Sequence, residues 1–277
     1  MAVRPRLARL LRPVRRFVSP LRRLTNRGRL LDDLERFGTW TYPFELAEGV
    51  TTPLHQPWMA ESHETRSRMT FERLDEIYAG RWPQITCLDV ACNEGFFGME
   101  VCRRGAKDVV AFDARDVNVE KAEYVKRHFG LENISFHVED VTRLTPERFG
   151  TFDLTLCLGL LYHLENPMDC LRRIRAVTRD LCVIDTQVLH KSDPVITAWI
   201  TKDRLIETPN VIGIIEEPDA VWNPAASVTG LSFVMNETAL LTMLRHAGFR
   251  EVERVEPFPG CFQPYATGDR VVLLARV

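Results

Sequence analysis

Three aspartates in this chain stand at or just beyond the ends of short apolar runs, where carboxylates can bind the hydrogen-bond donors of a small ligand. They are Asp89 in the run 85–90, Asp113 at the end of the run 109–113, and Asp140 after the run 134–138. The carboxyl ends of parallel strands meet at one edge of a sheet, so we expect these acids to share a pocket. Acceptors of this kind suit an ammonium group, the two hydroxyls of a ribose and the exocyclic amine of an adenine.

The turn after the first run, residues 91–97, contains one glycine, Gly95, and leads into a helical pattern. Dinucleotide-binding enzymes use the fuller G-x-G-x-x-G pattern, whose glycines let the backbone approach a pyrophosphate. The turn therefore favours a nucleoside without phosphates. Two simpler interpretations stay open, in which Asp113 only caps the next helix and Asp140 belongs to a solvated acidic loop.

A tyrosine and a histidine follow the run 152–158, where a fourth strand would end at the same edge. His163 can take a proton from a hydroxyl group, and Tyr162 can position a polar ligand. The alternatives are a structural, hydrogen-bonded His163 and a packing role for Tyr162. We treat both as candidate catalytic residues.

The elements that must position these side chains alternate between strand and helix from residue 85 onward. Short apolar strands separated by amphipathic helices predict an α/β fold with a mainly parallel sheet covered on both faces. A later helix has a readable cap, Asn236, and a readable end, Gly248. The predicted strands are 85–90, 109–113, 134–138, 152–158, 181–186, 249–255 and 270–277, and the predicted helices are 97–104, 117–129, 168–178 and the one after Asn236.

The remaining segments suggest three parts of the chain. Residues 1–30 form a basic arm, expected to be disordered or peripheral. Residues 31–80 form an N-terminal helical cap, and residues 81–277 form the main domain. Within that domain, residues 188–235 interrupt the alternation and are predicted to be an insertion over the edge that holds the site, while residues 257–268 read as a Pro- and Gly-rich loop.

The net charge of −2 conceals a strong asymmetry. Residues 1–30 hold ten arginines and no Asp, Glu or Lys, which leaves 26 basic and 38 acidic residues, or −12, in the rest of the chain. The arm is interpreted as a solvated tail, as a segment that binds RNA or a membrane surface, or as a transit peptide.

The seven cysteines form no C-x-x-C pair, so we expect buried thiols in a reducing compartment and no metal site. No apolar stretch reaches the roughly 18 residues of a membrane span. The expected location is the cytoplasm, at its membrane surface if the arm binds lipid, with organellar import as the less favoured alternative.

The pattern Asp-x-Ala-x-x-x-Gly, formed by Asp89, Ala91 and Gly95, resembles motif I of the class I S-adenosylmethionine (SAM) methyltransferases. The resemblance is strong over residues 85–187, and the order of elements matches to the C-terminus. It implies a Rossmann-like fold with a seven-stranded, mainly parallel sheet, and SAM as cofactor. It also implies that the cofactor is held by Asp89, Ala91, Cys92, Asn93, Gly95, Phe97, Asp113, Ala114, Asp140, Val141 and Leu158.

A narrower resemblance concerns residues 160–167 and 40–53, which are similar to segments of the tRNA wobble-uridine (carboxy)methyltransferase-like family. In its carboxymethyl branch a lysine meets the extra carboxylate of carboxy-SAM. Thr70 stands at that position here, and Arg66 or Arg68 could substitute for the lysine. We therefore expect ordinary SAM rather than carboxy-SAM.

A body of charge −12 is a poor surface for RNA unless the basic arm supplies the contacts. The expected function is therefore methyl transfer to a small-molecule, lipid or glycan acceptor bound beneath residues 188–235 and 40–75. A tRNA-modifying enzyme is the first alternative, and an inactive methyltransferase-like binding module is the second. The sequence does not predict the oligomeric state.

Overall fold

The computed structural model describes residues 20–189, 210–216, 227 and 229–277. The first nineteen residues of the expected basic arm and much of the expected insertion therefore lie outside the described residues. Among the described residues, no helix combines the length and the hydropathy that crossing a membrane requires.

Seven strands form the central sheet, as predicted, in the order β10-β11-β7-β6-β3-β4-β5. The five strands β3 to β7 run parallel, and β11 is antiparallel to both β7 and β10. The bounds are β3 Thr86–Val90, β4 Asp108–Asp113, β5 Ile134–Val138, β6 Phe152–Leu158, β7 Thr178–Gln187, β10 Glu251–Arg254 and β11 Arg270–Arg276. The carboxyl ends of β3, β4, β5 and β6 consequently meet at one edge.

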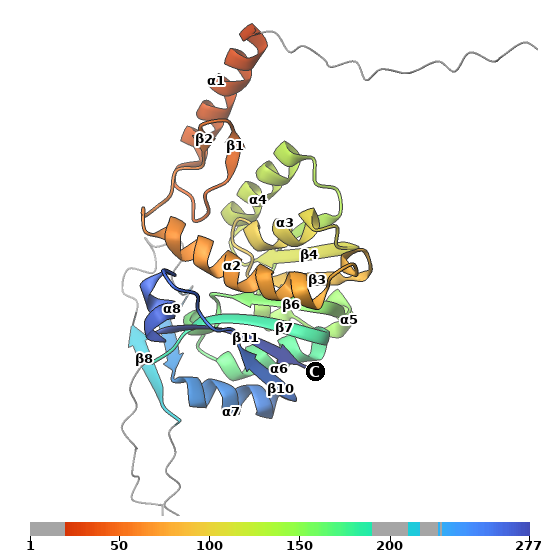
Figure 1. Ribbon diagram of the computed structural model, residues 1–277, viewed down its shortest axis with the longest axis vertical. Helices are drawn as coiled ribbons and strands as arrows, with labels where there is room; N and C mark the ends of the chain where they lie inside the picture. Colours follow the sequence, from red (N-terminus) through yellow and green to blue (C-terminus); the bar gives the residue numbers. More distant parts are fainter. Residues whose placement is uncertain (1–19, 190–209, 217–226, 228) are drawn as a thin grey trace, which may run out of the picture.

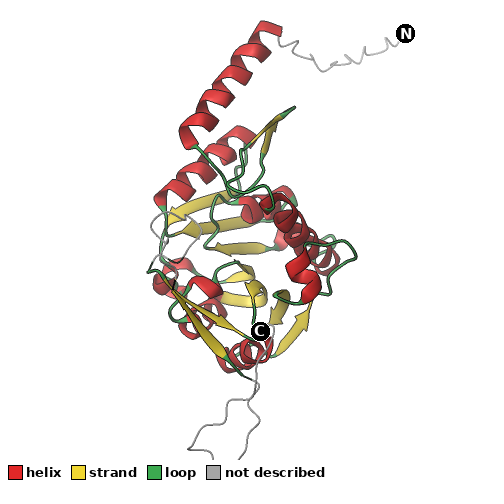
Figure 2. Ribbon diagram, turned by 90° about the vertical axis from the view of Figure 1, so that its left-hand side faces the viewer, coloured by secondary structure: helices red, strands yellow, loops and turns green. Residues whose placement is uncertain are grey.

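Helices cover both faces of this sheet (Figures 1 and 2). Alternate residues of each strand point to opposite faces, so Cys87 joins one hydrophobic core and its neighbour Leu88 joins the other. The first core packs under α2, α3 and α4, and the second under α6 and α7. Their bounds are α2 Met59–Ile77, α3 Phe96–Arg103, α4 Asp116–Phe129, α6 Pro167–Val177 and α7 Glu237–Ala247, with a short α5 at Pro146–Phe149.

Local sequence explains where these helices begin and end. Asn166 and Asn236 accept hydrogen bonds from Asp169 N and Ala239 N at the starts of α6 and α7. Gly248, as predicted, ends α7 in the left-handed conformation. The prediction of a loop over residues 257–268 was wrong in one respect, because this segment contains the short helix α8, Gln263–Thr267. Pro264 can start that helix, since its fixed φ suits a first turn.

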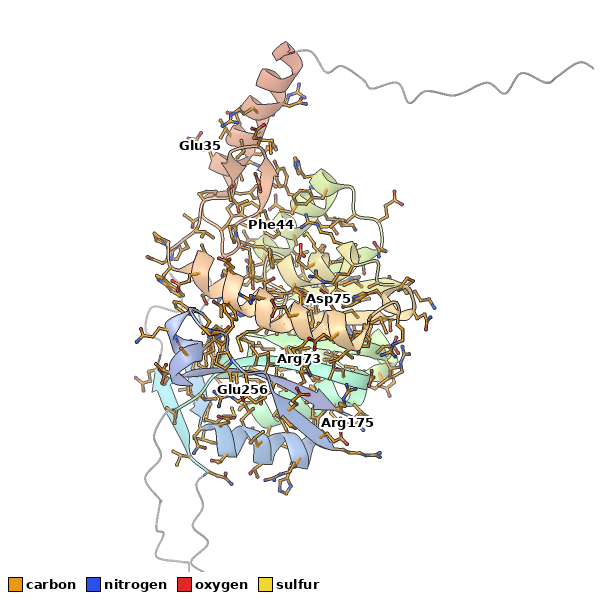
Figure 3. The ribbon with its side chains drawn as sticks, viewed as in Figure 1. Glu35, Phe44, Arg73, Asp75, Arg175 and Glu256 are labelled. Carbon is orange, nitrogen blue, oxygen red and sulfur yellow. The ribbon has the colours of Figure 1, made fainter. Side chains whose placement is uncertain are left out.

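The N-terminal part, residues 20–80, packs against the sheet by means of α2. Helix α1, Pro20–Phe37, extends away from the body and crosses residue 30, the expected end of the arm (Figure 1). A small hairpin follows, with β1 at Glu45–Ala47 and β2 at Val50–Thr51. Two side chains of α2, labelled in Figure 3, form ion pairs with neighbouring elements: Arg73 pairs with Glu253 of β10 at 2.8 Å, and Asp75 pairs with Arg104 at 3.0 Å.

The described part of the expected insertion is an antiparallel hairpin of β8, Ile212–Glu216, and β9, Leu231–Met235. Asn236 joins it to α7, because its side-chain oxygen accepts both Val211 N and Ala239 N at 3.1 and 3.0 Å. Strand β9 lies beside the short 3₁₀ helix η3, Leu161–His163, which follows β6. The hairpin is thus fixed next to the carboxyl edge of the sheet.

Candidate cofactor and acceptor site

A cavity of about 570 Å³ opens at the carboxyl ends of β3, β4, β5 and β6. Nine of the residues predicted for the site line it: Ala91, Asn93, Asp113, Ala114, Asp140, Val141, Leu158, Tyr162 and His163. The other four predicted residues, Asp89, Cys92, Gly95 and Phe97, are not among its lining residues. The hairpin β8–β9 contributes Ile215, Ser232 and Val234 to the wall.

The turn between β3 and α3 has an unusual backbone. Ala91 and Asn93 adopt φ values of 53° and 51°, and Gly95 adopts 78°. Few residues other than glycine occupy this left-handed region, and such strain often marks a functional turn. At Gly95 a Cβ atom would lie 2.4 Å from the Phe136 ring, so a glycine is required there. The other two positions face the cavity and have side chains.

Asp89 lies beneath this turn. Its Oδ2 accepts a hydrogen bond from Gly98 N at 2.8 Å, inside the first turn of α3. Burial raises the pKa of this carboxyl to about 7. Asp89 therefore positions the turn and the helix, and the structure does not bring it to the wall on which Asp113 and Asp140 lie.

Asp113 ends β4 on the cavity wall and organises the loops on both sides of it. Its Oδ2 accepts Asn93 N at 2.8 Å, and its Oδ1 accepts Arg115 N at 2.9 Å and Asn118 Nδ2 at 3.0 Å. Burial raises the pKa of this carboxyl. The side chain thus supports the start of α4, as the simpler interpretation expects, and it also faces the cavity. Its binding of a ribose stays a prediction.

Asp140 follows β5 and caps the 3₁₀ turn η2, Val141–Arg143. Its Oδ1 accepts Thr142 N at 2.8 Å and Thr142 Oγ1 at 2.6 Å. The neighbouring Glu139 also lines the cavity and is paired with Arg148. Acidic side chains therefore lie at the ends of both β4 and β5, the side of the sheet predicted to bind adenosine.

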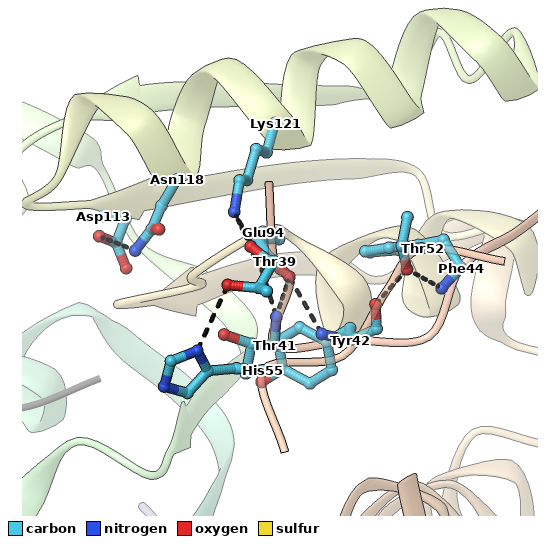
Figure 4. Close-up of polar contacts among 10 residues, drawn as sticks. All are labelled: Thr39, Thr41, Tyr42, Phe44, Thr52, His55, Glu94, Asp113, Asn118 and Lys121. Carbon is cyan, nitrogen blue, oxygen red and sulfur yellow. Dashed lines mark hydrogen bonds and ion pairs between the residues drawn. The ribbon is translucent and has the colours of Figure 1, made fainter. Parts of the chain in front are cut away.

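A buried ion pair, which the sequence analysis did not single out, attaches the N-terminal segment to the turn (Figure 4). Glu94 Oε2 accepts the backbone amides of Thr41 and Tyr42 at 2.9 and 3.0 Å. Lys121 Nζ donates to Glu94 Oε1 at 3.1 Å and to Thr39 O at 2.6 Å. Burial raises the pKa of Glu94 to about 6. We call these residues the Glu94 clamp; it places Thr41 and Tyr42 on the cavity wall.

Arg66 of α2 and Arg270 of β11, here called the arginine pair, surround Asp185 of β7. The sequence analysis named Arg66 only as a substitute for a lysine, and it named neither Arg270 nor Asp185. Arg66 Nε lies 3.2 Å from Asp185 Oδ1, and Arg270 Nε donates to the same oxygen at 2.8 Å. Tyr265 OH donates to Asp185 Oδ2 at 2.8 Å. Burial alone would raise the pKa of Asp185, but Arg270 and Arg66 hold it below its ordinary value. Two guanidinium groups share one carboxylate, so this trio has a net charge of +1.

The arginine pair meets the candidate catalytic segment near Gly159. Arg270 Nη2 donates to Tyr162 OH at 3.3 Å. A Cβ atom on Gly159 would lie 3.3 Å from Tyr162 OH, 3.4 Å from Arg270 Nη2 and 3.6 Å from Arg66 Nη1. Three polar groups therefore converge around one point of the wall. The rings of Tyr162 and His163 lie 4.2 Å apart between centroids, so the structure brings both candidates together.

The structure also distinguishes the two arginines considered as substitutes for a lysine. Arg66 is buried on the cavity wall, whereas Arg68 is half exposed and pairs with Glu72 at 2.7 Å. Thr70 is buried and is not among the lining residues of the cavity. Only Arg66 of these three side chains lies on the wall.

Comparison with known proteins gives concordant results. Residues 83–239, more than half of the chain, match the family model described as "Methyltransferase domain". Among curated proteins, the chain is 28% identical over 125 residues to a tRNA U34 carboxymethyltransferase of Campylobacter fetus subsp. fetus (strain 82-40), covering 44% of this chain and 43% of that protein. It is 31% identical over 129 residues to one of Shewanella pealeana (strain ATCC 700345 / ANG-SQ1), covering 46% and 38%. The chain thus spans less than half the length of these relatives.

Among solved structures, the chain is similar to the N-terminal domain of EvdMO1, crystallised in the presence of SAH and D-fucose. The TM-score is 0.67 at 20% sequence identity, with 91% of this chain and 97% of that chain covered. At this identity the likeness concerns the fold.

Proposed function

We propose, since the chain belongs to the methyltransferase domain family, that it transfers a methyl group from SAM to a small-molecule, lipid or glycan acceptor. That the chain is a SAM-dependent methyltransferase follows from the family and the fold. The choice of acceptor is our proposal. The observation that supports it most is the cavity of about 570 Å³, within the range of roughly 300–1,000 Å³ typical of small-ligand sites, with the hairpin β8–β9 in its wall.

The donors and acceptors of the wall fit SAM. Asp113 and Asp140 present carboxylate oxygens where the ribose hydroxyls and the adenine amine would donate hydrogen bonds. SAM carries its methyl group on a sulfonium. When an acceptor atom attacks the methyl carbon, the carbon–sulfur bond breaks and the sulfonium becomes a neutral thioether. Little acid catalysis is needed at such a leaving group, so positioning by the protein is the main contribution.

We assign to Tyr162 the positioning of the acceptor and to His163 the removal of a proton from it. Tyr162 is oriented by the hydrogen bond from Arg270. His163 lies beside it on η3 and lines the cavity, where it can take the proton of an acceptor hydroxyl.

His163→Ala should lower turnover by roughly 10²-fold or more, because general-base catalysis typically contributes 10²–10⁴-fold. The dissociation constant of SAM should change by less than about threefold. Turnover is measured with a methyl-transfer assay that detects SAH, and affinity by calorimetry. Equal losses in turnover and affinity would show that His163 only supports the fold of the cofactor site.

A second candidate function is transfer of a carboxymethyl group to tRNA. The convergence of Arg66, Arg270 and Tyr162 around Gly159 favours it, since these groups would suit a carboxylate on the transferred group. The similarity to tRNA U34 carboxymethyltransferases also supports it. The acidic body argues against an RNA surface unless the ten arginines of residues 1–30 supply it.

Two experiments separate these candidates. Mass spectrometry of the ligand that co-purifies with the protein distinguishes SAM from carboxy-SAM by mass. A salt titration of tRNA binding, with and without residues 1–30, tests the acceptor; absence of affinity at low salt excludes tRNA. A third experiment, calorimetry with SAM and SAH, tests the remaining alternative: a chain that binds neither ligand would be a binding module.

A further inference from the structure

We propose that His63 is a specificity-determining residue of the acceptor site and that it hydrogen-bonds an uncharged hydroxyl group of the acceptor. The proposal rests on the methyltransferase function proposed above. His63 belongs to α2 and lines the cavity, yet it is only 6% exposed. Within the part of the chain that the structure describes, neither ring nitrogen has a partner at hydrogen-bonding geometry, although the backbone of Thr41 acts on the ring and raises its pKa, against the larger effect of burial. A buried polar group of this kind is satisfied when a ligand supplies the partner.

The surroundings of His63 place it at the acceptor end. Its ring packs on Tyr42, 4.3 Å between centroids, and it stands one helical turn before Arg66. The charges of Arg66 and Arg270 act on it directly. Arg270 belongs to β11, whereas the acids predicted to bind adenosine lie at the carboxyl ends of β4 and β5, on the other side of β3 and β6. His63 therefore lies away from the adenosine end of the cavity.

The charge state of His63 selects the kind of group that it can bind. Its pKa is lowered to about 2, first by burial and then by the neighbouring Arg66 and Arg270. The ring is neutral at working pH, with one nitrogen that donates and one that accepts. It cannot keep a proton and is therefore not a general base at neutral pH. A hydroxyl group, which also donates and accepts, complements it.

Recognition of a hydroxyl by a buried polar group is strongly selective. When the ligand lacks the hydroxyl, the ring stays desolvated without a partner, so the analogue binds poorly. An apolar side chain of similar size would pack at residue 63 without this penalty. The arginine pair nearby provides an anchor for a carboxylate. Small hydroxy acids are thus suitable probes of this corner of the cavity.

The test compares L-lactate with propionate, which differ by one hydroxyl group. Each is titrated into the full chain saturated with SAH, and the histidine ring resonances are followed by NMR. We expect lactate to bind at least about tenfold more tightly than propionate and to shift the His63 ring signals. His63→Phe should abolish the preference and leave the SAH dissociation constant within about twofold. His63→Gln, which keeps a neutral donor and acceptor, should retain part of it.

Thr70→Val is the matched control. Thr70 lies on the same helix and its hydroxyl is also buried without a partner among the described residues, but it does not line the cavity. This variant should keep the lactate preference. Equal binding of lactate and propionate to the wild-type chain, or binding of neither, overturns the proposal.

Two further readouts separate other roles. A more than tenfold loss of SAH affinity in His63→Phe would assign His63 to the cofactor and overturn the proposal. A fall in its melting temperature with the lactate preference retained would make His63 a structural residue. If the wild-type chain does not bind SAH at all, the proposed methyltransferase function fails, independently of His63.

Discussion

At the scale of single residues, the strand-turn-helix motif divides into side chains on the cavity wall and side chains beneath it. Asp113 and Asp140 were predicted from the ends of apolar runs and do line the cavity. Cys92 and Phe97 point into the core instead, where Phe97 stacks on Phe71 with centroids 5.9 Å apart. The sequence pattern locates such a turn, but not which of its side chains face inward, because that depends on φ values of individual residues.

The charged contacts that the sequence did not predict share another cause. Arg66, Asp185 and Arg270 come from three elements that are far apart along the chain, so no spacing rule pairs them. Glu94 stands in a turn, where an acid is ordinarily solvated, and its burial depends on the segment 39–42 folding over it. Such contacts follow from the tertiary arrangement rather than from local pattern.

Gly95→Ala should be clearly destabilising, by about 3 kcal/mol. The left-handed conformation costs a residue with a Cβ roughly 1–2 kcal/mol, and the clash at 2.4 Å with Phe136 adds an overpacking cost of similar size. The measurement is urea unfolding. Gly130→Ala is the matched control, since Gly130 has φ +65° but no atom within 4 Å of its Cβ position. Equal destabilisation of the two variants would contradict the role of the clash.

Asp89 should make the stability of the chain depend on pH. Its pKa is raised from 3.8 to about 7, first by burial and then by Asp113. Between these values the folded chain binds a proton that the unfolded chain does not, so this contribution is fully present below about pH 4 and is lost as the pH rises through 7. Asp89→Asn removes the titration.

The difference in unfolding free energy, wild type minus Asp89→Asn, should therefore fall between pH 4 and pH 7. This difference should fall by at least about 1 kcal/mol, which corresponds to a pKa shift of less than one unit. Denaturant unfolding at closely spaced pH values measures it. A difference that stays constant, or grows with pH, would show that the Asp89 carboxyl is not perturbed in this direction.

At the scale of elements, hydrophobic periodicity predicted the sheet strands and the helices α3, α4, α6 and α7 to within a few residues. Strands of four to ten residues with polar turns between them leave little ambiguity. The hairpin β8–β9 was not predicted as strands. Ile212, Ile214 and Ile215 of β8 are exposed, so its pattern lacks the alternation that marks a half-buried strand.

Asn236→Ala should cost roughly 1–2 kcal/mol of stability. The side-chain oxygen caps α7 and also holds Val211 N next to the hairpin, so two backbone amides lose a partner. Asn236→Asp keeps an oxygen acceptor and should lose much less. Urea unfolding of both variants measures the difference. Equal stability of Asn236→Ala and Asn236→Asp would show that an oxygen acceptor at residue 236 is not needed.

At the scale of the whole molecule, the cavity joins parts that would otherwise be independent. Its wall includes the N-terminal segment fixed by the Glu94 clamp, the edge of the sheet, the described hairpin, and Arg270 at the start of β11, the last strand. A ligand that fills it contacts all of them, so binding should stabilise the chain as one unit.

SAH at about one hundred times its dissociation constant should add about 2.7 kcal/mol to the free energy of unfolding. For a chain of this size the melting temperature should rise by roughly 5–10 °C. NAD⁺ at the same concentration is the control and should produce no shift, because the turn at Gly95 lacks a glycine-rich pyrophosphate site. A thermal scan with each ligand measures this, and a larger shift with NAD⁺ would contradict the SAM assignment.

The placement of the arginine pair has a consequence for how such enzymes diversify. Arg66 and Arg270, like His63, lie outside the matched segment 83–239, whereas Asp113 and Asp140 lie inside it. Part of the proposed acceptor end is thus encoded outside the stretch of the gene that encodes the cofactor motif, although Tyr162 and His163 lie inside it. If these side chains choose the acceptor as proposed, substitutions in residues 40–75 or near the C-terminus should change the accepted substrate while the cofactor motif stays intact. Conversely, a fragment cut to the matched segment would lack the side chains proposed to choose the acceptor.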